Sequence, residues 1–213
     1  MDKSVEKVIP ELVQQHAEET SFLWLLREGA VSAPHYYLKD LAEHDERVEA
    51  HVDGLRIAGE PGWEICKESL GQEEAGEVFA ASVLAFESGE DSRIESVLEV
   101  GAKSYELYRG LVSALGWIPY ELIANILKRF LNSDSPFLQR VGVAGMAVHR
   151  QDPGPVLGEF LGASSPFHQP SSCRRRTCYI SSAAKTSHED RKAQSCTPRS
   201  ARRYISCKPS RQK

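Results

Sequence analysis

Apolar residues recur along most of the chain at the three- and four-residue spacing of an α-helix. The clearest stripes are Val78, Phe79, Val83 and Phe86, then Leu107, Tyr108, Leu111, Val112 and Leu115, then Leu122, Ile123, Ile126, Leu127 and Phe130. No stretch between turn residues alternates apolar and polar positions as a half-buried strand would. The pattern predicts an all-α chain of short helices, each about 8–20 residues long, joined by tight turns.

Residues that start and end helices flank these stripes. The predicted starts are Ser92 with Glu95 as a capping box, and Ser135-Pro136 and Asp152-Pro153 with proline at the first helical position. The predicted ends are Gly89, Gly101, Gly116 and the cluster Asn132-Ser133-Asp134. These signals separate the apolar stripes into individual helices.

The helical segments repeat along the sequence. Residues 104–115 align with residues 135–146 after a shift of 31, and residues 94–98 align with residues 122–126 after a shift of 28. A period of about 30 residues is typical of helical hairpins stacked into an α-solenoid. We therefore expect a short solenoid of HEAT-like hairpins, with an earlier pair in residues 61–87. The alternative is a three-helix bundle whose spacing is fortuitous.

Charge and composition change sharply near residue 162. Residues 1–162 hold 14 Lys and Arg against 28 Asp and Glu, a formal charge of −14, whereas residues 163–213 hold 12 against 2, a charge of +10. The second segment has 11 Ser and 4 Cys but no Leu, Val, Met or Trp, too few apolar residues for a core. We expect an N-terminal helical region over 1–60, truncated HEAT-like repeats over 61–162 and a disordered Ser/Arg/Cys-rich tail over 163–213.

The tail allows three interpretations. Its arginine clusters suit a nucleic-acid-binding arm. Its four cysteines and a nearby histidine could bind zinc, although no CxxC pair is present. These residues are Cys173, Cys178, Cys196, Cys207, His168 and His188. The abrupt loss of Leu and Val favours the third interpretation, a segment read out of frame from near residues 163–166.

An out-of-frame tail implies a truncated protein. A solenoid buries each repeat against its neighbour, and the helix predicted over residues 153–161 has no second helix to cover it. Its apolar residues are Val156, Leu157, Phe160 and Leu161. We expect a marginally stable product whose residues from about 165 onward are disordered and readily proteolysed.

Three segments carry a resemblance to a known family: residues 16–27 (HAEETSFLWLLR), residues 33–41 (APHYYLKDL) and residues 45–56 (DERVEAHVDGLR). They resemble the N-terminal part of an uncharacterised proteobacterial HEAT-repeat protein family, whose members are roughly twice this length and in some cases are encoded near type VI secretion genes. The resemblance covers about residues 10–162. It implies a HEAT-like architecture and transfers no catalytic residue, because the family has no established activity.

Within residues 1–162, candidate metal ligands occur in one segment. Asp40, His44 and His51 share a helical face, but the two histidines are two turns apart, about 10 Å along the axis, too far to bind one ion. No third ligand accompanies Asp40 and His44, and HExxH is absent. We expect a solvated face with an Asp40–His44 pair and ion pairs such as Glu43–Arg47.

Other reactive or aromatic residues are better explained by packing. Cys66 has apolar neighbours and is expected to be a buried, inert thiol. Trp24 and Trp117 lie in apolar runs and are expected to pack in the core. Tyr36 and Tyr37 could form an exposed aromatic patch, although packing is the favoured interpretation. Phosphate-binding and serine-hydrolase motifs are absent, so we assign no catalytic, cofactor-binding or metal residue.

The repeat without a reactive cluster indicates a non-enzymatic protein–protein interaction scaffold, in a process that the resemblance links to type VI secretion. The charge of −14 on residues 1–162 predicts a protein partner with a neutral or basic contact patch and disfavours nucleic acid. The alternative is a HEAT-like DNA-repair or lyase-type enzyme. Because the longest apolar run is residues 22–26 and no signal sequence is present, we expect a cytoplasmic protein without a membrane partner.

Overall fold

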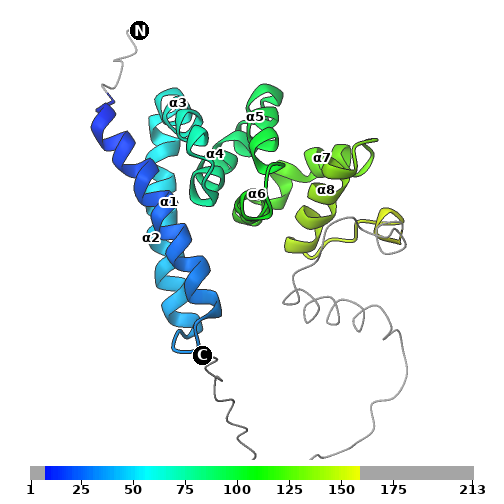
Figure 1. Cartoon of the computed structure of the whole chain (residues 1–213), viewed down its shortest axis with the longest axis horizontal. Helices are drawn as coiled ribbons and strands as arrows, with labels where there is room; N and C mark the ends of the chain where they lie inside the picture. Colours follow the sequence, from blue (N-terminus) through cyan, green and yellow to red (C-terminus); the bar gives the residue numbers. More distant parts are fainter. Residues whose placement is uncertain (1–7, 159–213) are drawn as a thin grey trace, which may run out of the picture. The chain divides into compact units, whose positions relative to one another are not determined.

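The structure is a computed structural model that describes residues 8–158. Its helices are α1 (Pro10–Ser32), α2 (Leu38–Ala58), α3 (Glu60–Ser69), the 3-10 helix η1 (Leu70–Gln72), α4 (Ala75–Ser88), α5 (Asp91–Gly101), α6 (Tyr105–Trp117), α7 (Tyr120–Leu131) and α8 (Pro136–Val148). No β-strand occurs within residues 8–158, and the predicted all-α fold is confirmed (Figure 1). None of these helices combines the length and the apolar character needed to cross a bilayer.

α1 and α2 form a long helical hairpin. They have 23 and 21 residues, more than the predicted length, and they lie side by side (Figure 1). Both helices also contact α3 and α4. The hairpin therefore shares its core with the helices that follow it.

Three shorter hairpins follow, and they stack. α3 pairs with α4, α5 with α6, and α7 with α8. The first helices begin at residues 60, 91 and 120, and the second helices begin at residues 75, 105 and 136, which is the predicted period of about 30 residues. α4 contacts α6, and α6 contacts α8, so the second helices follow one another through the stack (Figure 1). The predicted stack of helical hairpins is confirmed.

The register of the repeat differs from the sequence alignment at α7. A shift of 28 pairs Ile94 with Leu122, but Ile94 is 2% exposed and Leu122 is 59% exposed. Ile123 and Leu127 are fully buried, and they match Ile94 and Leu98 after a shift of 29. The alignment failed because Leu122 and Ile123 are adjacent and equally apolar, so hydrophobicity alone does not distinguish their faces.

The centre of the core is aromatic. Trp24 stacks on Phe79 with ring centroids 5.3 Å apart, and its indole N–H donates to Ser113 Oγ at 2.8 Å. Trp117 lies edge-on to the same phenyl ring, with centroids 5.4 Å apart. The prediction that both tryptophans serve packing is confirmed.

Most predicted helix ends agree with the structure. Gly89 ends α4 in the left-handed conformation, and Ser135 precedes α8 with Pro136 at its first position. The capping box at Ser92 is wrong, because α5 begins at Asp91 and Ser92 lies inside the helix. An acidic first residue interacts favourably with the helix dipole and makes the serine cap unnecessary.

Several predictions fall on residues 159–213, outside the described part of the chain: the disordered or out-of-frame tail, its zinc site and the end of the helix over 153–161. Within the described part, Asp152 Oδ1 accepts a hydrogen bond from the backbone N–H of Gly154 at 2.8 Å. This turn delays the helical conformation to residue 156, so the predicted start at Pro153 is wrong.

Candidate functional site

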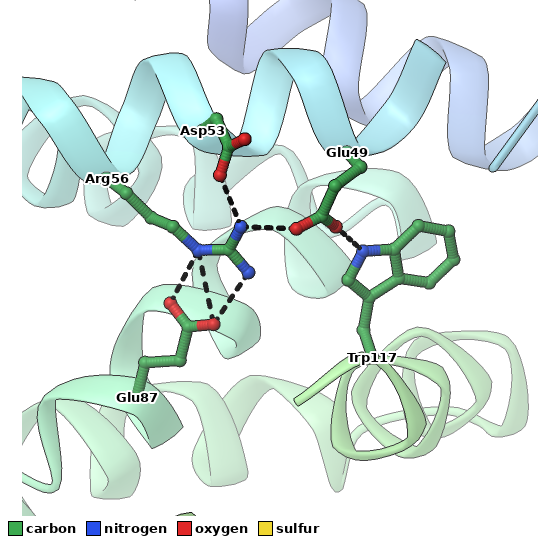
Figure 2. A network of polar contacts seen from close by, with 5 residues as sticks. All are labelled: Glu49, Asp53, Arg56, Glu87 and Trp117. Atoms are coloured by element: carbon green, nitrogen blue, oxygen red, sulfur yellow. Dashed lines mark hydrogen bonds and ion pairs between the residues drawn. The ribbon is translucent and has the colours of Figure 1, made fainter. Parts of the chain in front are cut away.

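The most connected polar group in residues 8–158 is the guanidinium of Arg56 on α2. It donates to both carboxylate oxygens of Glu87 on α4, with Nη2 and Oε1 2.7 Å apart, and to Glu49 and Asp53 on its own helix at 2.5 and 2.7 Å. Glu49 also accepts the indole N–H of Trp117 at the end of α6 (Figure 2). These contacts join α2, α4 and α6.

The Arg56 network is a structural clamp. Hydrogen bonds raise the pKa of the guanidinium, and the bond to Glu87 contributes most. The side chain of Arg56 therefore stays positively charged at every accessible pH. Each side chain in Figure 2 has at least one partner within the network, so the contacts serve to join the helices. The sequence alone did not reveal this clamp, although Glu49, Asp53 and Arg56 share a helical face.

A pocket of about 300 Å³ lies between α1, α3 and α4. The residues that line it come from four elements, α1, α3, η1 and α4, and from the turn before α4. They are Ala17, Glu18, Ser21, Phe22 and Leu25 of α1, Cys66 and Ser69 of α3, Gln72 of η1, Glu74 of the turn, and Glu77 and Ala80 of α4. Three of them are glutamates and none is a cation, so the pocket is acidic.

One glycine sets the distance between the helices beside this pocket. A Cβ at Gly76 would lie 2.6 Å from the carbonyl oxygen of Ser21. Only glycine therefore allows α4 to approach the α1 backbone this closely. Glu77 follows Gly76 directly and lines the pocket. The close contact therefore fixes the position of the Glu77 backbone relative to α1.

The carboxylate of Glu77 is partly removed from water. Its Oε2 atom is buried and has no hydrogen-bond partner among the described residues. Burial raises the pKa of the carboxyl; a hydrogen bond from its own backbone amide opposes that rise, and the nearby Glu74 adds to it. The pocket thus contains an acceptor whose charge nothing in the described part neutralises.

Two large apolar side chains of α1 accompany these acids. Phe22 and Leu25 line the pocket, yet 57% and 41% of their surface remains exposed to solvent. Cys66 also lines the pocket but is 1% exposed, and burial raises the pKa of its thiol to about 12. The predicted burial of the thiol is confirmed, and a protonated buried thiol is a poor nucleophile.

The predicted Asp40–His44 pair is wrong. Asp40 Oδ2 accepts the backbone N–H of Tyr37 at 2.8 Å and so caps the start of α2. Asp40 caps the helix and does not pair with His44, because the first amides of a helix lack partners within it. The ring of His44 packs against Tyr36, and its Nδ1 is buried with no hydrogen-bond partner in residues 8–158.

The other contacts of this segment also differ from those predicted. Glu43 pairs with Lys39 at 3.8 Å and not with Arg47. His51 faces His16 of α1 across the hairpin. No group of three or more His, Cys, Asp or Glu side chains in the described residues is arranged to hold a metal ion.

The tyrosine pair lies in the turn between α1 and α2. Tyr36 is 36% exposed and contacts the rings of His35 and His44. Tyr37 is 75% exposed, so the packing expected of both tyrosines applies to Tyr36 only. Tyr37 is the residue before α2, and its backbone amide donates to Asp40.

No protein-family model, curated protein or solved structure matches this chain.

Proposed function

We propose that this protein is a non-enzymatic scaffold that binds another protein through the acidic and apolar outer face of α1. The observation that carries the proposal is that α1 is apolar on two sides. Its buried residues include Val13, Leu23 and Trp24, while Leu12, Phe22, Leu25 and Leu26 are each 41–57% exposed. A helix that is apolar on both sides normally has partners on both sides.

The acidic charge of residues 1–162 indicates which kind of partner this face attracts. Leu12, Phe22, Leu25 and Leu26 share a face of α1 with Glu18 and Glu19. Eight of the basic residues between Arg27 and Arg129 form ion pairs with acids of the same chain, which leaves the surplus of −14 over residues 1–162 uncompensated. Residues 1–162 therefore attract a partner with a neutral or basic contact patch, whereas they repel DNA and the same acidic residues of a second copy.

The same charge argues against the DNA-repair or lyase alternative, because a basic groove is required to hold phosphates. The resemblance to the HEAT-repeat family supports a scaffold and points to a process linked to type VI secretion. The proposed setting is the cytoplasm, as expected from the sequence.

The proposal is tested by site-specific photo-cross-linking in the native cell. A photoreactive phenylalanine analogue is placed at Leu26, which is 43% exposed on α1, and in a matched control at Leu122, which is 59% exposed on α7. We expect an adduct from position 26 alone, to a lysine- or arginine-bearing segment of another protein, and its yield should fall in Glu18→Lys. Equal adducts from both positions, or none from position 26, would contradict the proposal.

A further inference from the structure

Two histidines from different helices face each other between α1 and α2. The Nδ1 atom of His16 on α1 lies 3.2 Å from the Nδ1 atom of His51 on α2, and the ring centroids are 5.2 Å apart. Neither residue is fully buried, so the pair is in contact with solvent. The two helices therefore bring two imidazole nitrogens to one place.

The separation of these nitrogens is close to that of two ligands on one metal ion. Imidazole nitrogens bind Zn²⁺ at about 2.0–2.1 Å, and at the tetrahedral angle two of them are then about 3.3–3.4 Å apart. In the hydrogen-bonded pair one ring carries its proton on Nδ1. When that proton moves through solvent to Nε2 of the same ring, both Nδ1 lone pairs become available to one ion, and both rings stay neutral.

The surroundings of the pair accommodate a cation. Burial and the charge of His16 lower the pKa of His51; Glu19 opposes this shift more strongly than Arg47 adds to it. Glu19 is also one turn after His16 on α1, so its carboxylate supplies negative charge beside the pair. A Cβ at Gly54 would lie 2.7 Å from ring atoms of His16, so this glycine leaves the space that the ring fills.

We propose that His16 and His51 together bind one divalent transition-metal ion, Zn²⁺ in the first place, through their Nδ1 atoms. Water completes the coordination, since no third His, Cys, Asp or Glu of the described residues is arranged with them to hold a metal. Two protein ligands make an exchangeable site, unlike the four ligands of a structural zinc site. The ion ties α1 to α2, and it does so whether or not the outer face of α1 binds a partner.

The test compares the urea unfolding of the full chain in EDTA with its unfolding in ZnCl₂ near neutral pH. An ion that binds only the folded state raises the urea midpoint, by about 0.5 M when it is present at about ten times its dissociation constant. We expect this rise in the unchanged protein and in the control His35→Gln, since His35 is exposed in the turn. Neither His16→Gln nor His51→Gln should show it, because one imidazole alone does not chelate. Zinc bound elsewhere, for example by cysteines, contributes equally to all four proteins.

A measurement on the unchanged chain keeps the test decisive if a variant does not fold. In ¹⁵N-labelled protein, a nuclear Overhauser effect between the two rings identifies His16 and His51. Zinc should shift both of their Nδ1 resonances together and leave both ring protons on Nε2.

Three results would each overturn the metal site: a urea midpoint that zinc does not raise, a rise that survives in His16→Gln or His51→Gln, or Nδ1 resonances that do not respond to zinc. The scaffold proposal is decided separately, because it is tested by the adduct at Leu26, and that experiment involves neither histidine.

Discussion

The Nδ1 atoms of His16 and His51 lie 3.2 Å apart across the interface of α1 and α2. At this distance one nitrogen donates a hydrogen bond and the other accepts it, so the two rings cannot both be protonated in this arrangement. The ring of His16 lies where a side chain at position 54 would be, because a Cβ at Gly54 would lie 2.7 Å from its ring atoms, so the glycine makes room for the pair. The pair therefore makes the hairpin sensitive to acid.

Stability should fall as the pH is lowered through the range just below 6.5. Burial lowers the pKa of His51, and the charges of His16 and Arg47 lower it further, while Glu19 opposes them. Between the lowered pKa and the unfolded value of 6.5, the unfolded chain binds more protons than the folded one, so acid favours unfolding. We expect the urea midpoint to decrease between pH 7.5 and pH 5.5.

The control for this prediction is the variant His51→Gln compared with His35→Gln. His35 is exposed in the turn, so its replacement should leave the pH dependence intact, whereas His51→Gln should flatten it. The raised pKa of Glu77 acts in the opposite direction, since the folded state holds that proton more tightly, and the comparison of the two variants cancels it. An unchanged pH profile in His51→Gln would show that the pair does not control stability.

Removing Arg56 should destabilise the protein much more than removing a surface arginine. Arg56→Met leaves Glu49, Asp53 and Glu87 without their shared cation, and we expect a loss of about 2 kcal/mol in the free energy of unfolding. The control Arg129→Met breaks an ion pair with Asp91 whose side chains are 55% and 65% exposed, and it should cost less than about 1 kcal/mol. Urea denaturation measures both. Equal losses would mean that the network of Figure 2 is no stronger than a surface pair.

The sequence predicted those features that follow from the periodicity of a single helix better than those that depend on how helices pack together. The stripes of α4 and α6 were predictable because Phe79, Phe86, Leu111 and Leu115 face one core, and their spacing follows from the geometry of a helix. α1 was harder to interpret, because an apolar residue such as Phe22 on its outer face is indistinguishable in sequence from one that packs inside.

The candidate site was not predictable from sequence. Glu18, Cys66 and Glu77 are far apart in the chain and meet only when α1, α3 and α4 pack. Their spacing matches no motif, and the burial of one oxygen of Glu77 results from that packing. The Arg56 clamp is an intermediate case: its α2 members share a visible face, but Glu87 comes from α4.

A methyl group at position 76 should separate α1 from α4. In Gly76→Ala the new Cβ would lie 2.6 Å from the carbonyl oxygen of Ser21, a backbone atom that cannot rotate away. We expect a loss of about 1–3 kcal/mol in the free energy of unfolding, even though alanine favours a helix by about 0.5–1 kcal/mol. Gly71→Ala is the control, since nothing lies within 4 Å of its Cβ position. If the two variants unfold at the same urea concentration, the contact is less rigid than described.

The register of the repeat at α7 can be tested by two adjacent substitutions. Ile123 is fully buried and occupies the position of Ile94 in α5, whereas Leu122 is 59% exposed. Ile123→Ala should therefore cost about 2–5 kcal/mol through lost burial and a cavity, and Leu122→Ala should change stability by less than about 0.5 kcal/mol. Both changes shorten a large aliphatic side chain to alanine on the same helix, so helix propensity does not explain a difference between them. A larger loss in Leu122→Ala would instead restore the 28-residue shift, because that alignment places Leu122 on the core face in the position of Ile94.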